Sequence, residues 1–483
     1  MIFHSLDFVI FFVAVTAVYW LLPRRGQNVL LFVAGYFFYG YVHPWFLILI
    51  VTSTVIDYCA ARGMEAWPAR RKAFLWLSIV TNFGMLGFFK YFNFFAENVQ
   101  GVLAAAGVNV DAPTLRILLP VGISFYTFQA MSYTIDVYRG ELHARRSLLD
   151  VAVFVSFFPH LVAGPIQRAS FLLPQVESRR RFSIDAARTG FLKIGWGFFK
   201  KLVIADNVGV IANKVFALSD PTFPLIWAGV FAFAIQIYAD FSAYTDIARG
   251  TSRWLGFELT ENFDHPYMAR SPADFWRRWN ISLSTWFRDY VYVPLGGSRA
   301  GGWKWARNVL ATFLLSGLWH GASWNYVLWG FYHGLLLVVT RAHGILWPAK
   351  RRAATQPRIV RSTVTVLQTA GMFVLTLIGW LLFRETELAA IVRDLTLSPF
   401  AAAPLENRAG LYLFLLTLAY SLPLWIQSLW VEAGRGEVGE RTSMSPEAGW
   451  GRVALQGMAC GVAFAAILVF RSQTSLDFIY FQF

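Results

Sequence analysis

Charged residues are scarce in this chain of 483 residues, because Asp, Glu, Lys and Arg together make up 14% of it, whereas hydrophobic residues make up 57%. A soluble domain typically carries about 25% charged residues, so this chain has little material for a solvated surface. Cysteine is also rare, since only Cys59 and Cys460 occur and they lie far apart. These shortages exclude a soluble enzyme, a disordered chain and a secreted disulfide scaffold.

Long apolar runs, by contrast, recur along nearly the whole chain. We predict an all-α, polytopic integral membrane protein with roughly 11–13 spanning or re-entrant helices around a central tunnel, because many runs approach the length that a membrane span needs. The apolar stretch 151–166 is interrupted by Pro159, Gly164 and Pro165. This pattern predicts a re-entrant or interfacial piece rather than a full span.

The charge balance is basic, with 42 Lys and Arg against 28 Asp and Glu and a net charge of +14. The basic residues stand in short clusters between apolar runs, for example Arg70–Lys72 and Arg179–Arg181. Such clusters are typical of cytoplasmic loops of membrane proteins. We therefore expect membrane lipid, and no nucleic acid, as a partner. The loop 96–114 has no Lys or Arg and is predicted to lie on the outer side.

The segment 262–299 is unusually rich in Trp, Arg and Tyr. Its centre, FWRRWNISLSTWFRDY at 275–290, is predicted to be a single helix with period 3.6. One face of that helix would carry Trp276, Asn280, Leu283, Phe287 and Tyr290. An aromatic face with one amide, flanked by arginines, suits a cavity for an anionic ligand, because the guanidinium fork matches phosphate oxygens. The alternative is an anchoring helix at the lipid headgroups.

The segment 317–334, GLWHGASWNYVLWGFYHG, places His320 between two apolar runs. An ionisable side chain at membrane depth is a functional hypothesis by default, and a neutral imidazole can serve as a general base. The spacings Gly317/Gly321 and Gly330/Gly334 predict closely packed helices. A structural histidine is the alternative for His320 and the favoured interpretation of His333. No histidine spacing suits a metal site, so no metal is predicted.

Polar residues also repeat every four positions in the apolar run 223–247, at Gln236, Asp240 and Tyr244. They share one side of a helix, where they either line a polar tunnel or hold neighbouring helices together by hydrogen bonds. Both interpretations stay open.

Six segments, in this order, resemble the membrane-bound O-acyltransferase family, and most of all the branch that includes the alginate O-acetylation membrane protein. The segments are LPVGISFYTFQAMSYTIDVYRG, FPHLVAGPIQR, DFSAYTDIARG, NFDHPYMARSPADFWRRWNISLSTWFRDYVYVPLGGSR, GLWHGASWNYVLWGFYHG and DFIYFQF. The resemblance covers most of the chain. It implies a single membrane domain over 1–483, with N-terminal helices in 1–115, a catalytic core in 116–345 and C-terminal helices in 346–483.

The resemblance further implies an O-acyltransferase of the bacterial inner membrane. It would take acetyl groups from cytoplasmic acetyl-CoA, with no bound cofactor, for O-acetylation of an exported polysaccharide such as alginate or another exopolysaccharide. A periplasmic acetyltransferase would be its partner. The acceptor could instead be a lipid, a wall polymer or a protein. A polysaccharide or ion transporter is a further alternative, and it would require broken helices in paired halves of the chain. The last alternative is a scaffold for a periplasmic acetylation complex.

Individual residues follow from the same resemblance. The invariant membrane histidine of the family falls on His320, as general base, and its second polar catalytic position falls on Asn280. The alginate-type pattern is expected to carry His at that second position, so this chain departs from it. Substrate or coenzyme A binding, or the lining of a tunnel, is expected of Trp276, Arg277, Arg278, Trp279, Arg288, Asp289, Tyr290, Trp319, Gln236 and Asp240.

Overall fold

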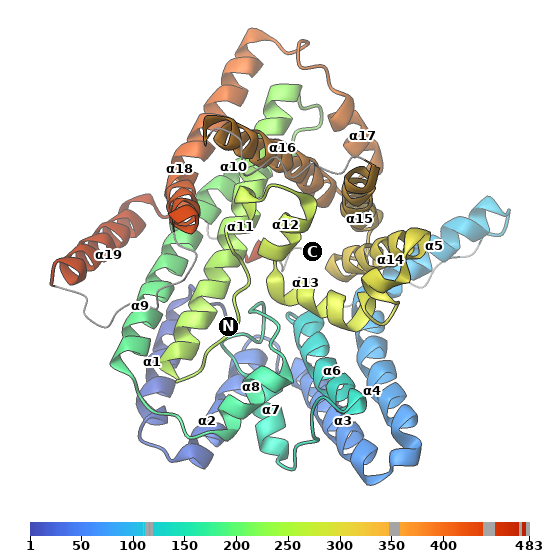
Figure 1. Ribbon diagram of the computed structural model, residues 1–483, viewed down its shortest axis with the longest axis vertical. Coiled ribbons are helices and arrows are strands. Elements are labelled where there is room, and N and C mark those ends of the chain that lie inside the picture. The colour runs from blue at the N-terminus through green and yellow to red at the C-terminus, as the bar shows by residue number, and fades with distance from the viewer. Residues whose placement is uncertain are drawn as a thin grey trace. The chain divides into compact units, whose positions relative to one another are not determined.

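The computed structural model describes residues 1–109, 111, 115, 119–346, 358–437, 450–472 and 476–479. Within those ranges every regular element is a helix and no strand occurs (Figure 1). The all-α prediction is therefore confirmed. The physical reason is that lipid offers no hydrogen-bond partners to the backbone. An apolar segment in a membrane can pair its own N–H and C=O groups by forming a helix.

The α-helices before residue 222 are α1 (Leu6–Tyr19), α2 (Arg24–Gly40), α3 (Leu47–Ala66), α4 (Arg71–Leu86), α5 (Phe92–Ala105), α6 (Ile123–Arg139), α7 (Leu148–Ser156), α8 (Ala169–Glu177), α9 (Ile184–Phe199) and α10 (Asp206–Phe216). Those after it are α11 (Phe223–Trp254), α12 (Pro272–Arg278), α13 (Ile281–Phe287), α14 (Gly302–His320), α15 (Trp324–Leu346), α16 (Arg358–Arg384), α17 (Leu388–Thr396), α18 (Pro404–Glu437) and α19 (Trp450–Phe470).

Short helical turns of other types join some of these helices. The 3₁₀ turns are Pro44–Phe46, Pro68–Arg70, Pro266–Met268 and Gly297–Ala300, and the π-helical turns are Gly87–Tyr91, Lys200–Ala205 and Arg288–Tyr292.

Five helical segments in the described part of the chain are long and apolar enough to cross a membrane. They are Pro44–Ala66, Pro68–Ala105, Phe223–Trp254, Ser362–Arg384 and Pro404–Arg435, and shorter apolar helices cover Leu6–Tyr19 and Gly461–Phe470. This set confirms a polytopic membrane protein. The central tunnel stays a prediction.

The chain divides into two compact units. The first comprises residues 1–194 and 244–260, and the second comprises 195–243 and 261–483. All of the predicted site residues lie in the second unit. In the first unit, the apolar stretch 151–166 is helical only as far as Ser156, three residues before Pro159. Because the proline ring disfavours helical backbone in the residue before it, the chain continues there in buried turns.

The close approach of α14 and α15 organises the second unit. A Cβ atom on Gly317 would lie 2.1 Å from the carbonyl oxygen of Tyr326, and one on Gly330 would lie 2.3 Å from that of Phe313. Only glycine therefore allows the two backbones to meet at this distance. The packing predicted from the glycine spacing is confirmed, and it places His320 at the end of α14.

Candidate active site

The segment 275–290 is not the single helix that its period predicts. Helix α12 ends at Arg278 and α13 begins at Ile281, and between them Asn280 adopts a left-handed backbone with φ of 41°. The predicted shared face of Trp276, Asn280 and Tyr290 is therefore wrong. Asparagine tolerates this conformation better than most residues, because its short polar side chain can bond locally.

The break is held by a residue far away in the sequence. The backbone carbonyl of Asn262 accepts a hydrogen bond from the amide of Ile281 at 3.0 Å. The side-chain Oδ1 of Asn262 accepts from the amide of Ser282 at 3.0 Å and from its hydroxyl at 2.8 Å. The first amides of α13 thus find partners outside the helix, which is what allows it to start there.

The side chain of Asn280 is 2% exposed, and its Nδ2 has no hydrogen-bond partner among the described residues. A buried donor without a partner is costly to a folded protein. Such groups, and residues held in sparsely populated backbone conformations, concentrate at functional sites. Asn280 therefore carries two independent marks of a site that is completed by a ligand.

His320 is the last residue of α14 and is 5% exposed. Its ring meets those of Trp329 and Phe383 edge to face, with ring centroids 4.9 and 5.2 Å apart. The neighbouring Trp319 is also buried, and its ring lies 5.0 Å from that of His320. Three aromatic rings therefore fix the orientation of the imidazole.

Trp329 also contacts a second buried histidine. The ring of His333 lies 4.9 Å from that of Trp329 and 5.1 Å from that of Trp276. One indole thus separates His320 from His333. The sequence pattern favours a structural role for His333. His333 lies thirteen residues after His320, and this spacing does not predict that both rings contact Trp329.

Trp279 and His320 belong to the same aromatic cluster. The ring of Trp279, which is 1% exposed, lies 4.8 Å from that of Trp380. Trp380 in turn contacts Phe383, whose ring contacts His320. Because Asn280 follows Trp279 directly, this cluster connects the two segments that carry the predicted catalytic residues. Trp380 and Phe383, both on α16, were missed by sequence reasoning.

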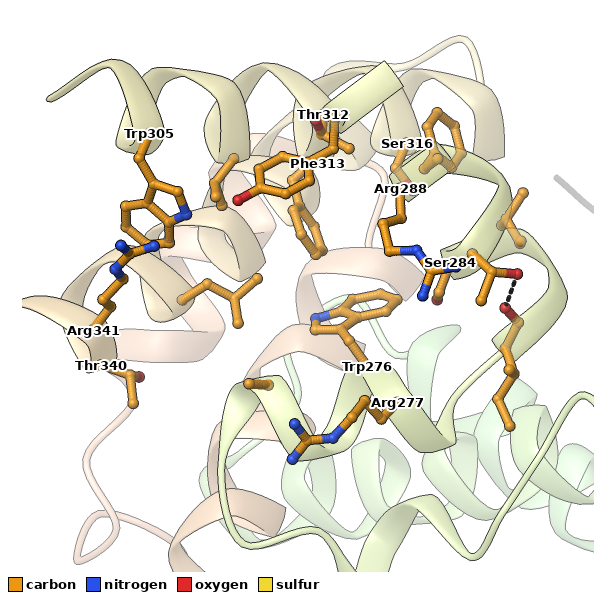
Figure 2. Close-up of a pocket in the computed structure, with 18 residues that line it drawn as sticks. Trp276, Arg277, Ser284, Arg288, Trp305, Thr312, Phe313, Ser316, Thr340 and Arg341 are labelled. Atoms are coloured by element: carbon orange, nitrogen blue, oxygen red, sulfur yellow. Dashed lines mark hydrogen bonds between the residues drawn. The ribbon is translucent and has the colours of Figure 1, made fainter. Parts of the chain in front are cut away.

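A cavity of about 530 Å³ lies beside this cluster (Figure 2). Its walls come from α12, α13, α14 and α15 and from the turn after α13. It is lined by Ala273, Trp276, Arg277, Ile281, Leu283, Ser284, Thr285, Phe287, Arg288, Tyr292, Trp305, Val309, Thr312, Phe313, Ser316, Leu337, Thr340 and Arg341. Ser316 stands one helical turn before His320, and Ile281 follows Asn280. The cavity therefore reaches the residue that follows Asn280 and the helical turn before His320.

Three arginines line this largely apolar cavity. Arg277 and Arg288 belong to the Trp- and Arg-rich segment 262–299, and each has an acidic neighbour. Arg277 lies 3.6 Å from Asp274, and Arg288 lies 2.7 Å from Asp289. The third, Arg341, was missed, because it lies near the end of a long apolar helix with no motif around it. Guanidinium groups in such a cavity favour an anionic ligand.

Other predicted site residues face elsewhere. Arg278 forms ion pairs with Asp274, at 3.1 Å, and with Glu432 of α18. Burial alone would lower its pKa, but the hydrogen bonds that Arg278 donates to the carboxylates of Glu432 and Asp274 raise the pKa above its ordinary value. Tyr290 contacts the ring of Trp286 at 4.9 Å. None of Arg278, Asp289, Tyr290, Trp279 or Trp319 lines the cavity.

Gln236 and Asp240 lie on α11 and face α10 and the turn before it. Asp240 pairs with Lys201 at 3.1 Å and accepts a hydrogen bond from the amide of Ile479 at 2.8 Å. The side chain of Gln236 lies against Gly209, where a Cβ atom would come within 2.7 Å of its Nε2. These contacts favour the interpretation that the polar repeat on α11 holds helices together. No group of three His, Cys, Asp or Glu side chains suited to a metal occurs among the described residues.

A helical membrane protein with a buried histidine, a strained buried asparagine and an arginine-lined cavity has the parts of a membrane-embedded transferase for an anionic substrate. Residues 140–346, which include Asn280, His320 and all residues that line the cavity, match the model of the membrane-bound O-acyltransferase family. The chain is 37% identical to the probable alginate O-acetylase AlgI of Pseudomonas putida over the full length of both.

Two further relatives extend this similarity. The probable alginate O-acetylase of Pseudomonas aeruginosa is 41% identical over 80% of this chain and 73% of its own. The peptidoglycan O-acetyltransferase of Helicobacter pylori is 32% identical over 78% and 75%. The chain belongs to the membrane-bound O-acyltransferase family, and it is an acyltransferase.

Proposed function

We propose that this acyltransferase takes acetyl groups from acetyl-CoA on the cytoplasmic side of the bacterial inner membrane for the O-acetylation of an exported polysaccharide. A periplasmic acetyltransferase would complete the transfer. The observation that carries the proposal is the end-to-end similarity to a probable alginate O-acetylase. The acceptor we favour is accordingly alginate or a similar exopolysaccharide.

The arginine-lined cavity is the proposed donor site. Arg277 and Arg288 offer planar, permanently charged groups to the phosphates of coenzyme A. The apolar wall formed by Trp276, Leu283 and Phe287 suits the pantetheine arm. The end of the cavity at Ser316 would deliver the thioester toward His320, one helical turn further along α14.

In the proposed reaction, one nitrogen of the His320 imidazole takes the proton of the hydroxyl that first receives the acetyl group, from which the periplasmic acetyltransferase would pass that group to the polysaccharide. The hydroxyl oxygen attacks the thioester carbonyl carbon and forms the new ester bond. The carbon–sulfur bond breaks, and the coenzyme A thiolate leaves and recovers the proton from His320. The aromatic rings around His320 keep its orientation constant through these steps.

Asn280 is proposed to donate a hydrogen bond from Nδ2 to the carbonyl oxygen as negative charge develops on it. The absence of a protein partner for this donor among the described residues supports the role. Because the donor is already buried and oriented, it would cost no reorganisation at the moment of reaction, and removal of such a group typically slows a reaction by ~10²–10³.

A wall polymer is the second candidate acceptor, since the relative from Helicobacter pylori is named a peptidoglycan O-acetyltransferase. Lipid and protein acceptors have no such support. A scaffold role makes the opposite prediction about His320, because a scaffold needs no base.

The test is the amount of ester-linked acetate on surface polysaccharide in a host that lacks the gene, complemented with wild type, His320→Ala or His143→Ala. The side chain of His143 is 98% exposed, so its variant is the matched control. All three proteins must reach the membrane in equal amounts. We expect wild type and His143→Ala to restore acetate and His320→Ala not to.

Other outcomes discriminate among the alternatives. Full restoration by His320→Ala would refute its role as base and favour a scaffold. If deletion leaves polysaccharide acetate unchanged but lowers acetate on peptidoglycan, the wall polymer replaces the exopolysaccharide as acceptor.

A further inference from the structure

A second buried amide lies at the helix break beside Asn280 and has no role in the reaction as proposed. Asn262 is 1% exposed, and its Nδ2 has no hydrogen-bond partner among the described residues. A buried donor without a partner lowers stability, so each such group in a folded protein calls for an explanation. The presence of two such donors at one break indicates a ligand that accepts both hydrogen bonds.

Backbone hydrogen bonds fix the position of Asn262 relative to Asn280. The amide of Ile281 donates to the carbonyl of Asn262 at 3.0 Å. The amide of Asp264 donates to the carbonyl of Arg278 at 2.9 Å. These two bonds lie on either side of the break between α12 and α13. They hold the two chain segments, and with them the two asparagines, side by side.

The orientation of the Asn262 side chain is fixed as well. Its Oδ1 accepts from the backbone amide of Ser282 at 3.0 Å and from the Ser282 hydroxyl at 2.8 Å. Because a backbone N–H can only donate, the oxygen and the nitrogen of the side-chain amide cannot exchange places. Nδ2 therefore stays on the branch of the amide that does not face Ser282, as a donor that is buried and already oriented.

We propose that Asn262 Nδ2 donates a second hydrogen bond to the carbonyl oxygen of the thioester, beside the one from Asn280 Nδ2. This inference rests on the proposed function and adds a catalytic residue to it. A carbonyl oxygen can accept two hydrogen bonds, and both become stronger as negative charge develops on it. Donors that are oriented before the reaction stabilise that charge without reorganisation. The two amides thus form a two-donor oxyanion site at the start of α13.

A purely structural role for Asn262 predicts something different. The contacts that hold α13 use its Oδ1 and its backbone carbonyl, and Nδ2 takes part in neither. Asn262→Asp keeps an acceptor at Oδ1 and nearly the same shape, but it removes the Nδ2 donor and adds a negative charge. Asn262→Leu removes the donor without adding a charge. A loss of rate in both variants is therefore due to the missing donor and not to the charge.

The experiment uses inverted inner-membrane vesicles from the complemented host, which enclose the periplasmic proteins and the polysaccharide. Labelled acetyl-CoA is added outside, and the label bound to polymer gives the maximal rate and the KM, normalised to the amount of folded enzyme. The variants are Asn262→Asp, Asn262→Leu and, as the reference for one lost donor, Asn280→Ala.

Two matched controls accompany these variants. Ser282→Ala removes the hydroxyl bond to Oδ1 of Asn262 but leaves Nδ2 and the backbone bond in place. Asn308→Asp makes the same substitution at another buried position, where Nδ2 already donates to the carbonyl of Leu295 at 2.8 Å. Both controls should keep the maximal rate, even where they lower the unfolding midpoint.

We expect both Asn262 variants to lower the maximal rate by ~10²–10³-fold, as the loss of one oxyanion donor typically does. The KM for acetyl-CoA should stay the same, because the bond gains its strength only in the transition state. Asn280→Ala should show the same separation of maximal rate from KM.

A wild-type maximal rate in Asn262→Asp, with Asn280→Ala impaired, would overturn this inference and leave the proposed function intact. An equal loss of rate in Ser282→Ala would also overturn it, because the effect would then belong to the start of α13 and not to Nδ2. If Asn280→Ala and His320→Ala both keep the wild-type rate, the proposed reaction itself is wrong and this inference fails with it.

Discussion

Lys201 and Asp240 form an ion pair of 3.1 Å in which the two side chains are only 5% and 4% exposed. The same ammonium group lies 2.8 Å from Asp206 and donates a hydrogen bond to the carbonyl of Leu476 at 2.9 Å. A single cation therefore joins α10, α11 and the segment 476–479. Asp240 therefore stabilises the second unit, and we expect its substitution to lower the stability of the fold rather than to act directly on substrate binding.

Replacement of Lys201 by Met should destabilise the protein by about 3–5 kcal/mol, because two buried carboxylates then lose their counter-charge. The measurement is the thermal unfolding midpoint of the protein in detergent or nanodiscs, together with the yield of folded protein after purification.

The matched control is the triple variant Lys201→Met, Asp206→Asn, Asp240→Asn, which removes all three charges with little change of volume. It should recover most of the stability lost in the single variant. If Asp240→Asn alone leaves the unfolding midpoint unchanged but abolishes acetylation, Asp240 serves the substrate path, and the structural interpretation is wrong.

Gly317→Ala should lower stability by ~1–3 kcal/mol, because its Cβ atom would stand 2.1 Å from the carbonyl oxygen of Tyr326 and the two helices would have to separate. The shift would also move His320 at the end of α14, so acetylation should fall with stability. The control is Gly371→Ala on α16, where nothing lies within 4 Å of the added atom. That variant should be neutral or stabilised by up to about 1 kcal/mol. A Gly317→Ala protein as stable as wild type would contradict the packing of α14 on α15.

The helices and the α14–α15 contact could be predicted from sequence because their causes are local: apolar runs of sufficient length, and glycines four residues apart. The break at Asn280 could not, since it depends on Asn262, whose hydrogen bonds reach α13 from another segment. Periodicity alone predicts a helix through such a point. The position of Arg341 in the cavity wall could not be predicted for a similar reason. It depends on the packing of α15 beside α12 and α14 around the cavity.

Arg277 and Arg278 are adjacent in the sequence, but their substitutions should have different effects. Arg278→Gln removes ion pairs to Asp274 and Glu432 and should lower the unfolding midpoint while the affinity for coenzyme A stays the same. Arg277→Gln, at a side chain that is 72% exposed and lines the cavity, should weaken coenzyme A binding with little change in stability. The test is to measure the unfolding midpoint and the affinity for coenzyme A for each of the two variants. The reverse pattern would assign the phosphate contact to Arg278.

His265 should make stability depend on pH. Burial is the largest influence on this side chain and lowers its pKa below the usual 6.5, Arg435 acts in the same direction, and Asp264 opposes them. The folded protein therefore binds this proton less readily than the unfolded chain, so the contribution to stability is present above pH 6.5 and is lost as pH falls through the folded pKa. Its Nδ1 lies 2.8 Å from the hydroxyl of Ser428.

The control for this prediction is His265→Asn. The backbone at this position is left-handed, with φ of 47°, which asparagine tolerates, and its amide can still bond to Ser428. Unfolding midpoints of the two proteins, recorded from pH 8 to pH 5, should differ by a constant amount above pH 7 and converge or cross below pH 6.5, because only wild type loses stability there. Parallel curves across the whole range would show that His265 titrates alike in the folded and unfolded chains, contrary to its burial against α18.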